Sequence, residues 1–386
     1  MADRSYCEID VNGQGITDAL DDILISLTVS DKAGSSSDTC QLEIDDTDGR
    51  VRMPPIGAQI VIRLGSDRSG IAEVFRGTVD EVRSNGSRGG GRTLRLSGKG
   101  VDTTKKAKEP QTRHIDNSTL EDALKKAGEA AGITTIRVDQ SLRSIRRDYW
   151  SLDNESFIAF GERIAREVGG TFKVQNDTAV MGRRGSGRSP QGETMPTVAA
   201  IWGSNLLDWD ISPVLGRPRY KEVRGRFYDR QAARWRDVTV QVPREDTGPT
   251  LTRRQTSADR DEAQNGADND ATDSAKNKGE GNVTILGDFL ARPEGTCIVS
   301  GARPGIDGDY KIESVEHTYS RTGWLTKLSL KQPGEEPGND TRTAGQGRGQ
   351  TTTATGAVPT PPARPAVPTS PTGGDPRFVP TVGREL

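Results

Sequence analysis

The chain is poor in the residues from which most metal and redox sites are built. Its 386 residues include only two histidines, His114 and His317, and three cysteines, Cys7, Cys40 and Cys297. The cysteines form no CxxC pair and no HExxH motif is present, which excludes a histidine-rich or cysteine-rich metal site. Because the cysteines are odd in number and widely spaced, we expect free thiols in a reducing compartment, with a bridge between subunits as the alternative.

Long apolar runs are also missing. No stretch of about 18 apolar residues occurs, so the sequence predicts no membrane span. Residues 1–6 lack a basic segment followed by an apolar one, so we expect no signal peptide and folding in a cytoplasm. With 31% hydrophobic residues and a mean hydropathy of −0.68, the chain has apolar material for two or three domains and little more.

An excess of positive charge is absent too. The 53 basic and 55 acidic residues give a formal charge of −2, whereas proteins that bind a nucleic-acid backbone usually carry a basic excess. Local basic stretches occur at residues 143–147 and 183–188. We interpret both as solvated loops, with contact patches as the alternative, and predict no sequence-specific binding of nucleic acid.

The common motifs of catalysis are missing as well. The sequence contains no GxSxG elbow and no GxxxxGK[ST] or GxGxxG motif after a predicted strand. The glycine-rich residues 86–91 lack the lysine and the helix of a phosphate-binding loop and predict a flexible loop. The acidic pairs Asp45–Asp46 and Glu335–Glu336 have the residue type used in glycoside hydrolysis, but 55 acidic residues produce such pairs by chance. We therefore predict no catalytic, cofactor-binding or metal-binding residues and no cofactor.

The sequence up to residue 101 is typical of antiparallel β-structure. Residues 60–64, 73–79 and 93–97 are short β-branched or alternating runs, separated by glycine-rich turns. Regularly spaced strands of this kind favour a β-sandwich or a β-barrel.

Helical patterns dominate the middle of the chain. A capping-box pattern, S-x-x-E, makes Ser118 the expected N-cap of a helix over residues 120–131. A second apolar stripe predicts a helix over residues 155–168, with Asn154 as its N-cap. A hairpin is expected next, over residues 171–181. This region therefore reads as a small α+β unit.

The β character returns after residue 199. Strands are expected over residues 220–228, 235–242, 283–286, 296–300, 310–319 and 324–330. Residues 257–278 hold few large apolar side chains and are interpreted as a helix, with a loop as the alternative. Within residues 310–319 the apolar side chains change parity, which predicts a β-bulge. His317 lies in this strand and is expected to be packed or hydrogen-bonded rather than to act as a base.

The sequence thus predicts a mainly β chain with an α+β insert, divided into four parts. They are a β domain over residues 1–101, an α+β domain over 102–196, a second β domain over 197–331 and a tail over 332–386. The tail is rich in proline, glycine and threonine and has almost no large apolar residues. It cannot build a core, so we expect it to be extended or disordered unless a partner orders it.

Three blocks of sequence, in order, carry a family resemblance. They are residues 75–82 with 92–102, residues 153–165 with 169–172, and residues 304–310 with 315–320 and 323–326. Together they resemble the late control protein D family of phage tail proteins, which are related to the hub proteins of contractile tails. The resemblance covers roughly residues 1–331, and the last block is its most specific part.

This resemblance implies a fold, an assembly and a location. It implies two tube-like antiparallel β-barrel domains that flank the small α+β domain. It implies a homotrimer that joins a sixfold tail tube to a threefold central spike, with no enzymatic activity. The implied partners are the tail tube protein, the central spike protein, the tape measure protein, and baseplate wedge or other small hub proteins. The protein would be assembled in the host cytoplasm and lie in the virion tail baseplate, where DNA passes through the lumen.

Two features of the last block have a structural explanation of their own. Residues 303–308 have the proline and glycines of a tight turn between strands. Tyr319 and Trp324 are candidate core or interface aromatics, with the core favoured.

Two other functions remain as alternatives. One is the hub part of a secretion-system spike, although such chains usually continue into a β-helical needle and this one ends in a proline-rich tail. The other is a tail-associated cell-wall hydrolase, which the missing catalytic motifs argue against.

Overall fold

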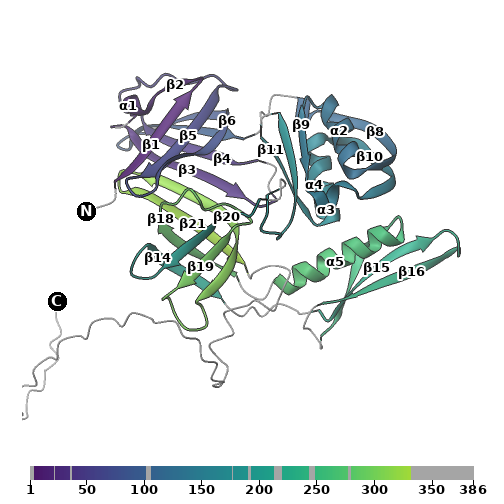
Figure 1. The fold of residues 1–386 in the computed structure, drawn as a ribbon. Helices are drawn as coiled ribbons and strands as arrows, with labels where there is room; N and C mark the ends of the chain where they lie inside the picture. The colour runs from purple at the N-terminus through teal and green to yellow at the C-terminus, as the bar shows by residue number, and fades with distance from the viewer. Residues whose placement is uncertain are drawn as a thin grey trace, which may run out of the picture. The chain divides into compact units, whose positions relative to one another are not determined.

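The computed structural model describes residues 4–20, 22–34, 37–100, 106–175, 177–189, 193–212, 220–242, 248–276 and 280–331 (Figure 1). The predicted tail, residues 332–386, lies outside the described residues. None of the described helices has the length and apolar character needed to cross a membrane.

Six antiparallel strands form a first β-unit, in the order β3-β4-β7-β6-β5-β1. Its elements are β1 (Ser5–Val11), β2 (Gln14–Gly15), α1 (Thr17–Leu20), β3 (Leu24–Lys32), β4 (Thr39–Asp45), β5 (Gln59–Ser66), β6 (Gly70–Ser87) and β7 (Gly91–Lys99). Alternate side chains point into one core, as in β5, where Ile60, Ile62 and Leu64 are fully buried. The antiparallel β-structure predicted here is confirmed, and only residues 88–90 of the predicted glycine-rich loop connect β6 to β7.

The α+β domain has two small sheets with helices packed against them. Its elements are η1 (Lys106–Lys108), β8 (Pro110–Thr119), α2 (Leu120–Ala130), β9 (Thr135–Val138), α3 (Gln140–Arg143), β10 (Arg146–Ser156), α4 (Phe157–Val168), β11 (Gly170–Gln175) and β12 (Thr178–Arg183). Strands β8 and β10 pair with each other, and β11, β12 and β9 form the second sheet. The predicted helices and hairpin are confirmed. Phe157, Phe160 and Phe172 are fully buried in the shared core.

Both predicted helix caps are wrong, and for the same reason. The N-cap of α2 is Thr119, whose side chain accepts the Asp122 amide at 3.3 Å. The N-cap of α4 is Ser156, which accepts the Ala159 amide at 3.2 Å. The ladder between β8 and β10 continues through Thr119 and Ser156, so each strand runs directly into its helix and the chain leaves extended geometry later than predicted.

A second β-unit follows, with six strands in the order β14-β18-β21-β20-β19-β13. Its strands are β13 (Thr197–Ile201), β14 (Leu206–Ser212), β18 (Glu280–Leu286), β19 (Thr296–Ser300), β20 (Gly308–Ser320) and β21 (Gly323–Lys331). The predicted bulge is confirmed, because the register of β20 against β21 shifts between Ile312 and Ser314. Tyr310 and Val315, on either side of the shift, are therefore both buried.

A separate subdomain is inserted between β14 and β18. It consists of β15 (Glu222–Asp229), β16 (Arg234–Gln241), β17 (Thr250–Ser257) and α5 (Arg260–Lys276). The predicted helix over residues 257–278 is confirmed as α5. The strands predicted over residues 220–228 and 235–242 exist, but they form a sheet of their own with β17. Ala263 of α5 lies so close that a Cβ on Gly225 would be 2.8 Å from its carbonyl oxygen, so this strand position needs glycine.

The two β-units share one continuous 13-stranded sheet, because β3 pairs with β20. Trp324 of β21 is 2% exposed and packs in the core of the first β-unit, which places it in the core as predicted. Tyr319 is partly buried against the same core. The mainly β fold with an α+β insert is thus confirmed, while the four predicted domain limits stay a prediction.

Candidate assembly surfaces

The two β-units repeat one strand order. Reading along each path, β3, β4, β7, β6, β5 and β1 correspond to β14, β18, β21, β20, β19 and β13. Five of the six strands keep their direction as well, whereas β1 pairs antiparallel to β5 and β13 pairs parallel to β19. One chain therefore contains two copies of a single structural unit.

Irregularities of the ladders repeat along with the strands. The register of β6 against β7 shifts between Val79 and Glu81, at the place where β20 shifts against β21. In both units the acidic residue at the shift forms an ion pair with the last residue of the next strand. The distances are 2.6 Å between Asp80 and Lys99 and 2.8 Å between Glu313 and Lys331. Bulges are usually retained features of a fold, so their coincidence supports a true structural repeat.

A third coincidence concerns the edge that starts each unit. The register of β3 against β4 shifts past Ile25, and that of β14 against β18 shifts past Leu207. The two bulged side chains are both exposed, at 40% and 45%. Asp208 to Ser212 therefore correspond, residue by residue, to Ser26 to Ser30.

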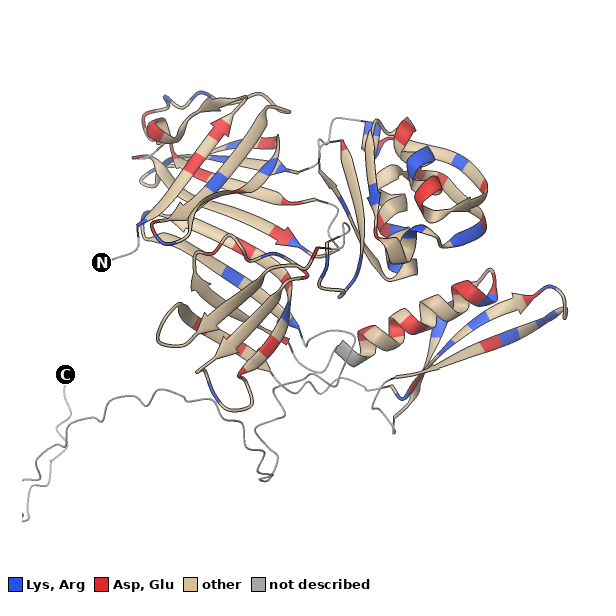
Figure 2. Cartoon of the chain, viewed as in Figure 1, with Lys and Arg blue, Asp and Glu red and all other residues tan. Residues whose placement is uncertain are grey.

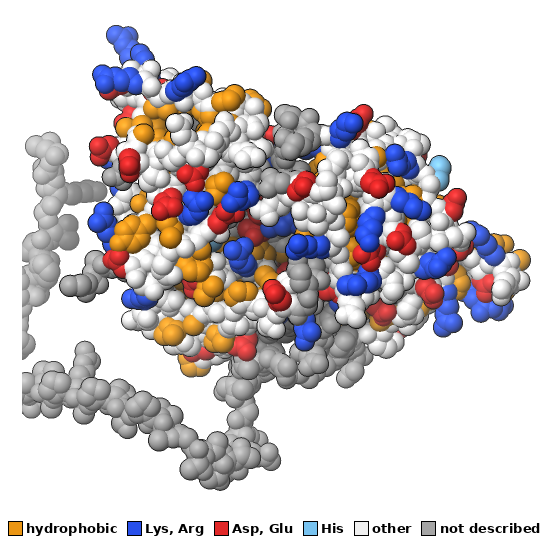
Figure 3. Space-filling view, turned by 45° about the horizontal axis from the view of Figure 1, so that its top comes forward, with side chains coloured by type: hydrophobic (Ala, Val, Ile, Leu, Met, Phe, Trp, Pro, Cys, Tyr) orange, Lys and Arg blue, Asp and Glu red, His pale blue; other side chains and the backbone are white. Residues whose placement is uncertain are grey.

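The contact between the units uses only one of two equivalent pairs of edges. Residues 26–32 of β3 pair with residues 314–320 of β20, which lie beyond the bulge. The equivalent edges are β14 and residues 81–87 of β6. Along both of them, no further strand pairs within the described part of the chain. Figure 3 shows that, on the face it presents, apolar side chains gather over the β-units.

A partly buried ionic cluster lies where the α+β domain meets the first β-unit. Lys173 on β11 contacts Asp31 at 2.6 Å and Asp38 at 2.5 Å. Burial and the nearby Asp31 carboxylate raise the pKa of Asp38 to about 7, against the lowering influence of Lys173. Two carboxylates share one ammonium group, so one of them tends to keep its proton.

His317 lies inside the contact between β3 and β20, opposite Val29. Its Nδ1 is 2.9 Å from the Thr326 hydroxyl, and that hydroxyl accepts the Asp288 amide at 3.0 Å. Burial lowers the pKa of His317 to about 4, so the ring is neutral near pH 7. The prediction of a packed, hydrogen-bonded strand residue is confirmed.

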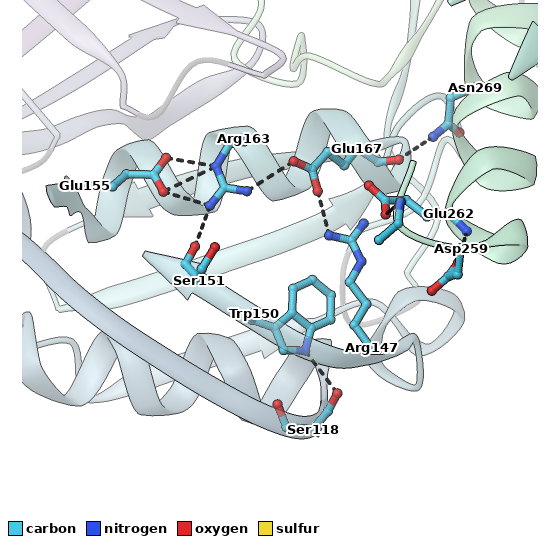
Figure 4. Close-up of polar contacts among 11 residues, drawn as sticks. Ser118, Arg147, Trp150, Ser151, Glu155, Arg163, Glu167, Asp259, Glu262 and Asn269 are labelled. Carbon is cyan, nitrogen blue, oxygen red and sulfur yellow. Dashed lines mark hydrogen bonds and ion pairs between the residues drawn. The ribbon is translucent and has the colours of Figure 1, made fainter. Parts of the chain in front are cut away.

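An ionic network covers one face of α4 (Figure 4). Arg163 donates to Glu155 at 2.8 Å and to Glu167 at 3.2 Å, and Glu167 also accepts from Arg147 at 2.7 Å. The Arg147 guanidinium lies 4.5 Å from the ring of Trp150. The basic stretch at residues 143–147, predicted to be a solvated loop, is therefore partly built into α3 and β10 and paired.

This network borders a groove of about 1180 Å³ between β10, α4 and the inserted subdomain. Ion pairs also join residues of the opposite wall, Arg236 to Asp229 at 2.9 Å and Arg226 to Asp237 at 3.0 Å. In Figure 2, basic residues recur along the β15–β16 hairpin and acidic ones along α5. Fixed ion pairs suit a structural contact better than acid–base catalysis, which needs groups that exchange protons.

Other residues singled out from the sequence lie apart from one another. Asp45 accepts the backbone amide of Thr47, and Asp46 accepts that of Val51, so the pair stabilises a turn. The pair Glu335–Glu336 lies outside the described residues. Among the described residues, no group of three histidine, cysteine or acidic side chains could hold a metal ion.

The turn predicted at residues 303–308 is present. The Asp307 carboxylate accepts the backbone amides of Gly301, Ala302 and Arg303. The first part of the most specific block of the family resemblance is therefore a tight, side-chain-stabilised connection between β19 and β20, and the rest of the block lies in β20 and β21.

The three cysteines are buried, and burial raises the pKa of each thiol to about 12. We expect none of them to react with a thiol reagent at pH 8 in the folded chain and all three to react after denaturation, because the thiolate is the reactive form. Counting labelled thiols by mass spectrometry tests this. A thiol that is labelled in the folded chain, or an oligomer that dissociates on reduction, would contradict it.

Comparison with known proteins gives these surfaces a context. No family model matches the sequence. The probable baseplate hub protein of Escherichia phage 186 is 28% identical over 186 residues, 48% of this chain and 47% of the relative. That of Escherichia phage P2 is 27% identical over 190 residues, 49% of this chain and 48% of the relative. Over about half of its length the chain is therefore similar to phage baseplate hub proteins.

The resemblance to hub proteins predicted from the sequence is thus confirmed, although the matched region spans about half the length of these curated relatives. Solved structures agree on the fold of the chain. A tail protein from Neisseria meningitidis MC58 matches with a TM-score of 0.63 and 19% identity, over 88% of this chain and 99% of that one. A component of the type VI secretion system of E. coli matches with a TM-score of 0.50 and 10% identity, over 86% and 77%.

Proposed function

We propose that the chain is the structural baseplate hub of a contractile phage-type tail. It would form a trimeric adapter that joins the sixfold tail tube to the threefold central spike. The observation that carries this proposal is the internal repeat: one chain supplies two copies of the same β-unit, so three chains supply six. The curated relatives, both named as probable baseplate hub proteins, support the same conclusion.

The partners follow from this position. The tail tube protein would contact the ring of six β-units, and the central spike protein would contact the opposite face. The tape measure protein and other baseplate proteins would lie nearby, in a virion assembled in the host cytoplasm. We propose no enzymatic activity, because the sequence lacks the common catalytic motifs and because Arg147, Arg163 and Arg236 beside the groove are held in ion pairs.

The hub of a secretion-system spike is the second candidate. The match to a type VI secretion component supports a fold common to both classes and does not distinguish them. A cell-wall hydrolase has less support, since the sequence lacks the common catalytic motifs.

The mass of the purified chain in solution tests the proposal. Light scattering is expected to give a trimer, or a monomer that becomes a three-to-three complex when its spike protein is added. An unrelated trimeric protein in place of the spike is the control and should not change the mass. A chain that stays monomeric with its spike would contradict the hub proposal, and activity on purified peptidoglycan would then favour the hydrolase.

A further inference from the structure

We infer that β14 of one chain pairs with β6 of a second copy, in the register that β3 and β20 adopt within the chain. The inference deepens the proposed function, on which it rests for the presence of a second copy. Its basis is the repeat. β14 is the equivalent of β3, and β6 is the equivalent of β20, so the second pair of edges is a copy of the first.

The in-chain contact provides the register. Ser26 pairs with Ser320, Thr28 with Thr318 and Ser30 with Glu316. Replacing each residue by its equivalent in the other unit gives the pairs between chains. They are Asp208 with Ser87, Trp209 with Gly86, Asp210 with Asn85, Ile211 with Ser84, and Ser212 with Arg83.

Both edges are places where a further strand could pair through its backbone. Unpaired strand edges template pairing with another chain, and proteins usually cover, shorten or charge them. In the described part of the chain, β14 is the terminal strand of the sheet, and residues 81–87 of β6 extend beyond the part that β5 covers. An antiparallel ladder between β14 and β6 would satisfy both edges at once.

The side chains are complementary in this register. The in-chain contact places Tyr319 opposite Leu27. In the copied contact the large side chain is Trp209, and the residue opposite is Gly86, which leaves room for it. On the outer face, Asp210 lies diagonal to Arg83, so opposite charges meet at a distance that favours attraction.

The geometry is that of a heterologous contact, in which two different surfaces meet. Such contacts generate a closed ring when the rotation between copies is a whole fraction of a turn, and an open filament otherwise. In-chain and between-chain junctions would then alternate around the ring. Each would be made by the same strand types.

Paired cysteines test the register. The double variant Asn85→Cys with Asp210→Cys is expected to give disulfide-linked chains on mild oxidation, because opposite residues in an antiparallel pair have Cα atoms about 4.5–5.5 Å apart. Thr28→Cys with Thr318→Cys is the matched in-chain control and should form a bridge within one chain. Glu81→Cys with Asp210→Cys is out of register and should not cross-link.

A second variant separates this inference from the hub proposal. A Cβ at Gly86 would meet only ordinary contacts within the chain, the nearest being Arg92 Cγ at 3.7 Å. Gly86→Phe should therefore fold with an unchanged unfolding curve and sediment as a monomer. If the wild-type chain is a trimer but the 85–210 pair does not cross-link and Gly86→Phe stays trimeric, the inference is wrong and the hub proposal stands. A wild-type chain that remains monomeric with its spike overturns both.

Discussion

Replacing Trp324 by alanine is expected to lower the free energy of unfolding by about 3–5 kcal/mol, the range for deleting a large buried aromatic side chain. Trp324 belongs to a strand of the second β-unit but is 2% exposed in the core of the first. Its ring also lies against Gly287, where a Cβ would come within 2.0 Å of it. The substitution should therefore weaken the packing between the two β-units. Denaturant unfolding measures the loss in free energy of unfolding.

Trp324→Phe is the matched control. The indole Nε1 of Trp324 has no hydrogen-bond partner within the described part of the chain, so phenylalanine sacrifices no hydrogen bond and keeps most of the buried surface. We expect it to cost less than half as much as alanine. A Trp324→Ala variant that loses under about 1 kcal/mol would mean that the side chain is not part of a packed core.

Lowering the pH should reduce the free energy of unfolding because of His317. Its pKa is about 4 in the folded chain and 6.5 in the unfolded chain, so the unfolded state binds the proton more tightly. The stabilisation is present above pH 6.5 and is lost as the pH falls towards 4, by about 3 kcal/mol in total. His317→Gln removes this dependence, and unfolding curves measured between pH 4 and pH 7 test it.

Asp38 acts with the opposite sign over the same interval. Its pKa rises from 3.8 to about 7 on folding, so its contribution is present below pH 3.8 and is lost as the pH rises through 7. In the wild-type chain the pH-dependent contributions of the two residues to the free energy of unfolding partly cancel. Asp38→Asn should therefore steepen the acid loss, whereas His317→Gln should flatten or reverse it. Identical pH dependence in both variants would show that neither group titrates as stated.

Much of the fold could be predicted because its signals are local. Alternation marks the strands of both β-units, a change of parity marks the bulge near Ile312, and apolar stripes mark α2 and α4. The helix caps were misplaced because a serine or asparagine near a helix start looks the same whether the chain is still in a ladder or not. Ser118 and Asn154 both lie in strands that continue to the helix.

The family resemblance implied two β-barrel domains, but the strand-by-strand equivalence between them and the inserted subdomain were not predicted, for a different reason. The repeat is visible only in strand pairing, register and bulges. The equivalent residues differ in type, since Gly86 corresponds to Tyr319 and Arg92 to Trp324. Strands β15 and β16 alternate like any others, so nothing local says that they pair with β17 rather than with the larger sheet. The ionic cluster of Lys173, Asp31 and Asp38 likewise joins residues that only the folded chain brings together.

The place of the inserted subdomain has a practical meaning. In the first β-unit the chain passes from β3 to β4 between Lys32 and Thr39, and at the equivalent point of the second unit it leaves at Ser212 and returns at Glu280. The subdomain is topologically a long insertion in the β14–β18 hairpin. The equivalent β3–β4 hairpin of the first unit has a short connection instead. Replacing the inserted subdomain by the short β3–β4 connection would give a smaller protein with both β-units. A foreign domain could be inserted at the same point while the ladder between β14 and β18 stays intact.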